Sequence, residues 1–175
     1  LIIEKVTGQT FKEYLHQKIL DPLDMENTES GAIEDITCDF VAPDTQIAFV
    51  NNPALTKGTG DMTSNVLDLY QYDRALFTGS LLSQESMDIL FDFLEGYSCG
   101  WMKDVRTSAL HMYGNGSKTS DEDTIFHGGR IPRFLGYNII NKFGEERIYV
   151  ILLFNNNEET TASFRSILSR IGAVL

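Results

Sequence analysis

A single change of hydrophobic period, close to Gly96, constrains the fold of this chain more than any other feature of its sequence. Before that glycine, apolar residues recur at helical spacing; after it, short apolar runs lie between turn-forming Gly, Asn and Asp. This pattern predicts an α+β fold, in which a helical front half precedes an antiparallel sheet of three to four strands. A last amphipathic stretch predicts a packed C-terminal helix, with an apolar face made of Phe164, Ile167, Leu168 and Ile171.

The change of period also suggests how the chain is organised. We expect a helical region over residues 1–96 and a sheet region with its C-terminal helix over residues 97–175. At 175 residues the two together are expected to form one domain. Between residues 27 and 57 no period persists, which predicts a long, partly strand-like excursion of the kind that often lines a site.

The helical region carries clear start and stop signals. Gly8 ends a first apolar helix, and Thr10 with Glu13 forms a capping box at the start of the next one. Ser64 or Asn65 begins a longer helix.

The sheet region contains four strand-length runs, over residues 97–103, 124–127, 134–141 and 147–154. The last run is the most apolar, and we expect it to be buried on both faces. Trp101, the only tryptophan, is expected to anchor the core.

Charge and cysteine content exclude several classes of function. The net charge is −11, so the chain repels phosphate backbones and we expect no nucleic-acid partner. No apolar run reaches the roughly 20 residues that span a bilayer. Cys38 and Cys99 have no neighbouring Cys or His at zinc-ligand spacing, so no metal site and no cofactor are expected. We expect two buried free thiols, with a single disulfide bridge as the less favoured alternative.

The best candidate site is His127, Gly128 and Gly129, where a strand end runs into a turn. Histidine changes charge near neutral pH, and glycine lets another molecule approach the backbone closely. On these residues alone, a strand end with an ordinary surface histidine is the alternative. His16 and His111 have no supporting motif, and we expect them to be surface or packing residues.

Four stretches of the chain have a shared pattern in a fixed order: residues 1–11, 19–25, 58–64 and 127–129. They contain a helix–Gly–helix entry, a Pro-Leu-Asp-Met segment, a glycine-rich turn into a helix, and His-Gly-Gly. In this order they resemble the C-terminal part of the serine β-lactamase and penicillin-binding protein family, of the class C and D-Ala-D-Ala carboxypeptidase type. Asp24 stands where that family usually has glycine, and Arg133 stands where glycine usually follows Ile-Pro.

Two motifs of that family are missing from their expected places. The chain contains no Ser-x-x-Lys, and its one Tyr-x-Asn, at residues 113–115, follows the other stretches in the wrong order. We interpret that Tyr-x-Asn as turn chemistry. The resemblance implies that the serine nucleophile, its lysine and the catalytic tyrosine lie before Leu1 in a parent protein.

The resemblance implies catalytic roles for His127, Gly129 and Arg130, and substrate-binding roles for Gly128 and Arg133. The N–H of Arg130 would donate to a developing oxyanion, and His127 would act toward the substrate carboxylate and the catalytic tyrosine. Both arginines would favour an anionic substrate. Two solvated loop arginines are an equally supported alternative.

The implied function is that of the C-terminal portion of a serine hydrolase acting on amide, ester or β-lactam carbonyls, with residues 1–96 lining the cleft. Alone, this portion is expected to be catalytically inactive. The alternatives are a non-catalytic penicillin-recognising or peptide-binding sensor module, and a plain interaction domain. Expected partners are a small-molecule or peptide substrate with a carboxylate, the N-terminal portion of the same protein, and a second copy through an exposed edge of the strand over residues 147–154. The resemblance also implies an extracytoplasmic or cell-envelope location.

Overall fold

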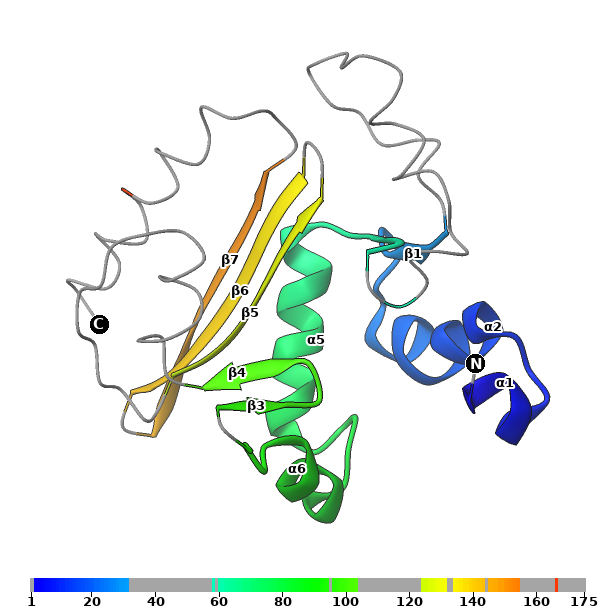
Figure 1. Cartoon of the computed structure of the whole chain (residues 1–175), viewed down its shortest axis with the longest axis horizontal. Helices are drawn as coiled ribbons and strands as arrows, with labels where there is room; N and C mark the ends of the chain where they lie inside the picture. The colour runs from blue at the N-terminus through cyan, green and yellow to red at the C-terminus, as the bar shows by residue number, and fades with distance from the viewer. Residues whose placement is uncertain are drawn as a thin grey trace. The chain divides into compact units, whose positions relative to one another are not determined.

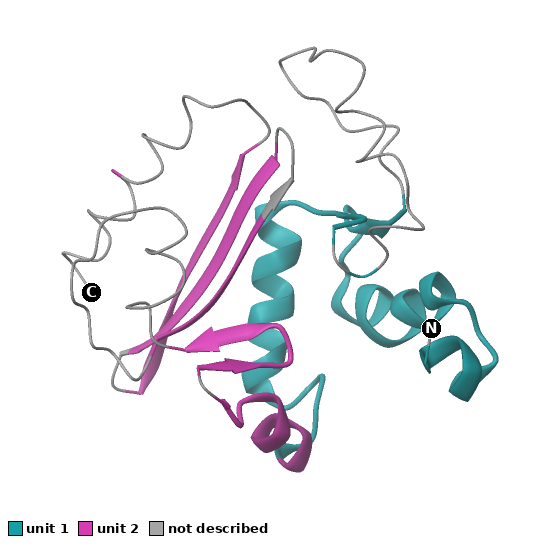
Figure 2. Cartoon of the chain, viewed as in Figure 1, with its two compact units in different colours: residues 1–36, 44–84 teal, residues 37–43, 85–175 magenta. Residues whose placement is uncertain are grey.

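The computed structural model of the 175-residue chain describes residues 2–31, 58, 60–94, 96–103, 124–131, 134–143, 145–154 and 166 (Figure 1). The chain divides into two compact units (Figure 2). Unit 1 comprises Leu1–Ile36 and Asp44–Gln84, and unit 2 comprises Thr37–Pro43 and Glu85–Leu175. The expected roles of residues 1–96 and 97–175 stay predictions.

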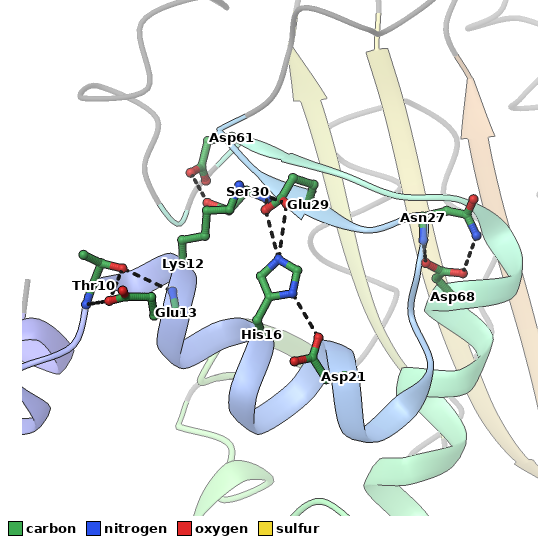
Figure 3. Close-up of polar contacts among 10 residues, drawn as sticks. All are labelled: Thr10, Lys12, Glu13, His16, Asp21, Asn27, Glu29, Ser30, Asp61 and Asp68. Atoms are coloured by element: carbon green, nitrogen blue, oxygen red, sulfur yellow. Dashed lines mark hydrogen bonds and ion pairs between the residues drawn. The ribbon is translucent and has the colours of Figure 1, made fainter.

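Unit 1 begins with a run of short helical segments: α1 (Ile2–Thr7), α2 (Phe11–Leu15), the π-helical η1 (His16–Leu20) and the 3₁₀ turn η2 (Asp21–Leu23). The predicted capping box is confirmed, because the Thr10 hydroxyl accepts from the Glu13 N–H while the Glu13 carboxylate accepts from the Thr10 N–H (Figure 3). Gly8 ends α1 with a φ of 73°. Asp24 ends η2 in the left-handed conformation, with a φ of 53°. The glycine usual at this place in the resembling family would adopt that conformation without strain.

A two-stranded ribbon and a long helix complete the described part of unit 1. The ribbon pairs β1 (Glu29–Ser30) with β2 (Met62–Thr63), and the helix is α5 (Val66–Thr78). Asn65 caps α5 by accepting from the Asp68 N–H, as predicted, and Gly79 ends it with a φ of 72°. Most of the predicted excursion over residues 27–57 lies outside the described residues.

The apolar core of unit 1 is small. Leu15, Leu20 and Met25 are buried, and they are packed against half-buried residues of the same helical run and of α5: Phe11, Ile19, Leu23 and Tyr72. Burial of these side chains fixes the helical run next to the N-terminal half of the chain's longest described helix.

Unit 2 contains α6 (Gln84–Leu90), which starts just before the unit's boundary, and a five-stranded antiparallel sheet. In spatial order its strands are β3 (Tyr97–Ser98), β4 (Trp101–Lys103), β5 (Thr124–Ile131), β6 (Phe134–Phe143) and β7 (Glu146–Phe154). The α+β fold is confirmed. The expectation of three to four strands was too low, because the run over residues 97–103 folds as a hairpin. Its two-residue turn, Cys99-Gly100, has φ values of 43° and 92°, which is the mirror-image turn that matches strand twist.

The core of the sheet lies on one face. Met102, Phe126, Leu135 and Tyr137 are buried there, packed against Ile139, Leu152 and Phe154. This follows from the register, since Phe126 pairs with Ile139 and both side chains point to the same face. Trp101 is buried, as predicted, with its ring edge-on to Phe91.

Two burial expectations were wrong. No residue of β7 is buried, because β7 is the terminal strand of the described sheet and is paired only with β6. Cys99 is an exposed free thiol, because it occupies the tip of the β3–β4 turn. Cys38, His111, the Tyr-x-Asn segment and almost all of the predicted C-terminal helix lie outside the described residues.

Candidate functional site

The His-Gly-Gly block lies inside a strand rather than at a strand end. β5 continues through it to Ile131 and pairs with β6 along its whole length. His127 lies opposite Asn138, Gly128 opposite Tyr137, and Gly129 opposite Gly136. The predicted turn therefore does not directly follow the two glycines, and residues 132–133 lie outside the described residues.

The backbone of β5 presents polar groups to the side away from β6. The Lys103 N–H donates to the Gly96 carbonyl oxygen at 2.8 Å, so the neighbouring Met102 directs its N–H and C=O toward β5. Met102 pairs with Phe126, and therefore Phe126 directs its own polar groups toward β4.

The alternation of backbone direction along a strand then gives the direction of the N–H groups that follow Phe126. Gly128 and Arg130 direct their N–H groups to the same side as Phe126. β4 reaches only to Phe126, and in the described part of the chain no strand pairs with residues 128–131 from that side. The N–H of Arg130 thus lies on a strand edge that no described strand covers, at the place where the resemblance implies an oxyanion donor.

Packing against a neighbouring strand explains why glycine stands at position 128, and this explanation requires no ligand. A Cβ atom built there would meet the Tyr137 ring at 2.7 Å from Cε1 and 3.0 Å from Cζ. Tyr137 is 2 % exposed and belongs to the core cluster, so its ring lies across the glycine in place of a side chain. The predicted substrate-binding role of Gly128 stays a prediction beside this packing role.

His127 and Gly129 lie on the face opposite to the core cluster. The His127 side chain is exposed, and a Cβ at Gly129 would meet nothing within 4 Å. Gly136, across from Gly129, likewise leaves this face without a side chain, apart from Leu153 Cδ2 at 3.3 Å from a Cβ built there. The structure thus brings an exposed imidazole next to a stretch of bare backbone.

Arg133 lies outside the described residues, as does the side chain of Arg130. The anionic preference assigned to the two arginines therefore stays a prediction. Within the described ranges, no group of three or more His, Cys, Asp or Glu side chains could hold a metal ion.

The described residues offer hydrogen-bond donors suited to a carbonyl compound, but they include no complete nucleophilic apparatus. An open strand edge with an outward N–H can hydrogen-bond an extended peptide-like ligand or a developing oxyanion. An exposed histidine can supply a hydrogen bond or a positive charge. The sequence contains no Ser-x-x-Lys that would attack the carbonyl.

The model of one family, described as Beta-lactamase, matches residues 1–171. The chain belongs to the beta-lactamase family. The resemblance found in four short motifs is thereby confirmed over nearly the whole sequence.

One curated relative within this group of proteins is the Bacillus subtilis (strain 168) protein named "Putative penicillin-binding protein PbpX". It is 24 % identical over 161 residues, which cover 89 % of this chain and 37 % of the relative. The chain spans less than two fifths of the length of that relative.

Solved structures of the D-amino acid amidase from Ochrobactrum anthropi SV3 share the fold. The complex with L-phenylalanine matches with a TM-score of 0.58 at 21 % identity, covering 89 % of this chain and 46 % of the amidase chain. The complex with L-phenylalanine amide matches with a TM-score of 0.58 at 20 % identity, covering 88 % and 48 %. The mixed helical and antiparallel architecture is therefore a beta-lactamase-like fold.

Sequence reasoning missed two features near functional positions. The Tyr137 ring beside Gly128 had no local signal, because the two residues are nine apart in sequence and become neighbours only through the β5–β6 register. The contacts of His16 had no local signal, because one of its partners, Glu29, lies 13 residues away.

In the described part of the chain, no helix has the length and apolar character needed to cross a membrane.

Proposed function

We propose that this chain is the C-terminal portion of a serine hydrolase that acts on amide, ester or β-lactam carbonyls. Membership of the beta-lactamase family and the fold shared with an amidase support this class of reaction. The observation that carries the proposal is the edge of β5 away from β6, where strand alternation directs the N–H groups of Gly128 and Arg130 outward and no described strand pairs with them.

The proposed division of roles follows from the chemistry of acyl transfer. A serine outside this chain attacks the carbonyl carbon, and negative charge develops on the carbonyl oxygen. The Arg130 N–H stabilises that oxyanion. Gly129 keeps the adjacent backbone free of side chain, and His127 donates a hydrogen bond toward the substrate carboxylate. Arg130 and Arg133 are proposed to favour an anionic substrate.

The 175-residue polypeptide by itself is proposed to be catalytically silent. Loss of the nucleophile and its base together removes the acylation route and leaves only binding effects. Hydrolysis of a chromogenic β-lactam or ester by the purified polypeptide, blocked by a serine-reactive probe, would contradict this.

The experiment that tests the function is intact-mass analysis of the protein purified from its source, before and after exposure to a fluorescent penicillin. A mass larger than that of these residues, with a covalent adduct, is the expected result. The recombinant 175-residue chain serves as the control and should gain no adduct.

One alternative is a non-catalytic penicillin-recognising or peptide-binding module, which loss of Ser-x-x-Lys and Tyr-x-Asn before Leu1 would favour. It would bind a carboxylate-bearing ligand at the β5 edge without turnover. Amide NMR shifts of Gly129 and Arg130 on addition of penicillin, without an adduct in either protein, would support this alternative over the hydrolase.

Location and assembly are also proposed. Relatedness to penicillin-binding proteins and beta-lactamases, which typically act outside the cytoplasm, supports a place in the cell envelope. We further propose a homodimer of the isolated chain through β7, the terminal strand of the described sheet. Sedimentation at high concentration should show a dimer, and a monomer throughout would contradict this assembly.

A further inference from the structure

His16 lies between two carboxylates, one at each nitrogen of its ring (Figure 3). Its Nδ1 is 3.0 Å from Asp21 Oδ1, and its Nε2 is 3.2 Å from Glu29 Oε2 and 3.4 Å from Glu29 Oε1. Asp21 belongs to η2, directly after the helix of His16, whereas Glu29 belongs to β1. The imidazole therefore joins the helical run to the ribbon.

Only the protonated ring satisfies both contacts. A neutral imidazole has one N–H and one lone pair, so in either tautomer one nitrogen would place its lone pair against a carboxylate oxygen. The imidazolium has two N–H groups and donates to both carboxylates. The geometry is thus that of a charged histidine.

The remaining charges around the ring strengthen this conclusion. Lys12, on α2, places its Nζ 3.0 Å from Glu29 Oε2, and the Ser30 N–H donates to Glu29 Oε1 at 2.7 Å. The charged groups facing His16 in the described structure are thus Asp21, Glu29 and Lys12. With His16 protonated, Asp21 and Glu29 each contact a cation; without that proton, Glu29 keeps Lys12 and Asp21 loses the charge of His16.

Glu29 is also connected to a group of buried polar residues through Ser30, its neighbour in sequence. The next residue, Ser30, pairs with Met62 and donates its hydroxyl to Asp61 Oδ2 at 2.9 Å. Asp61 is 2 % exposed; its Oδ1 accepts from the Gly58 N–H and its carbonyl oxygen accepts from the Gly31 N–H, both at 2.8 Å. Movement of Glu29 away from His16 would therefore loosen the ribbon and the turn that follows Gly58.

We propose that His16 is a pH-dependent clamp: its imidazolium holds the β1–β2 ribbon to the α2–η1 helical run, and loss of its proton loosens that side of the ribbon, which then keeps only the Lys12–Glu29 ion pair. The other side stays attached to α5, where the Asn27 N–H and the Thr28 hydroxyl each donate to Asp68 at 2.8 Å. Release is therefore a local opening within unit 1.

The pKa shifts of His16 and Glu29 give the direction in which stability changes with pH. Hydrogen bonds to Asp21 and then to Glu29 raise the pKa of His16 above its ordinary value. Burial acts to raise the pKa of Glu29, but contacts with Lys12, the Ser30 N–H and His16 outweigh it and lower the pKa overall. Folded-state stabilisation by His16 is thus complete below its ordinary pKa and is lost as pH rises through the raised value. The contribution of Glu29 is lost only in acid, as pH falls through its lowered pKa.

The first test is an NMR titration of the His16 ring in the full 175-residue chain. The His16 pKa should exceed that of a model histidine, and it should fall in both Asp21→Asn and Glu29→Gln. A His16 pKa at or below the model value, or no response to either substitution, would overturn the proposal.

The second test measures opening of the ribbon by amide hydrogen exchange at pH 6 and pH 8.5, corrected for the intrinsic rate. Protection of the Gly31 and Gly58 amides should fall about two- to fivefold at the higher pH, as expected for a partly exposed ion pair. His16→Gln should show the lower protection at both pH values, and the control His127→Gln should keep the wild-type dependence. An unchanged pH dependence in His16→Gln would overturn the clamp.

Discussion

Buried carboxylates organise the unit that contains α5, whereas an apolar cluster organises the five-stranded sheet. In unit 1, Asp61 and Asp68 are 2 % and 4 % exposed, and both accept hydrogen bonds from residues far away in sequence. In the sheet, Phe126 and Tyr137 are 1 % and 2 % exposed and contact other apolar side chains. Directional contacts require particular partners, whereas apolar packing requires matching volume. The two units should therefore tolerate different substitutions.

The largest effect is expected in the apolar cluster. Phe126→Ala should lower the free energy of unfolding by about 4 kcal/mol, because it removes a fully buried ring and leaves a cavity. Phe126→Leu, which keeps most of the volume, should cost much less. Urea denaturation of the three proteins measures the difference, and equal costs for both substitutions would show that the cluster is loosely packed.

The corresponding change in unit 1 is Asp68→Ala. It leaves the Asn27 N–H and the Thr28 hydroxyl without their buried acceptor and should cost about 3 kcal/mol. A hydrophobic residue of similar size, as in Asp68→Leu, should give no rescue, in contrast to the volume rule of the sheet. Urea denaturation provides the free energy, and rescue by leucine would remove the distinction between the units.

A smaller effect separates two neighbouring glycines of β5. Gly128→Ala should cost about 2 kcal/mol, because its Cβ would lie 2.7 Å from the Tyr137 ring. Gly129→Ala should be neutral for stability within about 0.5 kcal/mol, because nothing lies within 4 Å.

Thermal unfolding compares the two glycine variants. Combining Gly128→Ala with Tyr137→Leu should cost less than the sum of the two single changes, since the smaller side chain relieves the overlap. Strict additivity would show that the ring does not set the requirement for glycine at position 128.

The smallest effect concerns the β3–β4 turn. Cys99→Asn should stabilise the chain by about 0.5 kcal/mol, because asparagine tolerates the left-handed conformation that Cys99 adopts. Cys99→Ser is the matched control, since it removes the thiol without this conformational preference. Equal unfolding free energies for the two variants would mean that the turn does not limit stability.

Local signals in the sequence predicted local structure well. The Thr10–Glu13 capping box and the Asn65 cap involve residues three apart, so the sequence alone specifies the contacts. Short apolar runs between turn-forming residues predicted the strands β5 to β7, although β5 extends beyond His127. The strand count failed at Cys99, where a residue without a turn preference occupies a turn.

Contacts between distant segments could not be predicted in this way. His16 was expected to be a surface or packing residue because its own helix offers no ligand-like partner, and its link to Glu29 exists only once the ribbon has formed. The burial expected of β7 failed for a related reason. Apolar composition does not reveal whether a strand is central or terminal in its sheet.

The β5–β6–β7 meander has a consequence for the order in which the chain folds. Its strands are consecutive, and short connections join them, so each pairing closes a small loop. The contact between Asn27 and Asp68 in unit 1 closes a loop of 41 residues, and closing a longer loop costs more entropy. Contacts of low sequence separation form faster. The strand edge that carries Arg130 should therefore exist early in folding, before the carboxylate contacts of the helical unit are in place.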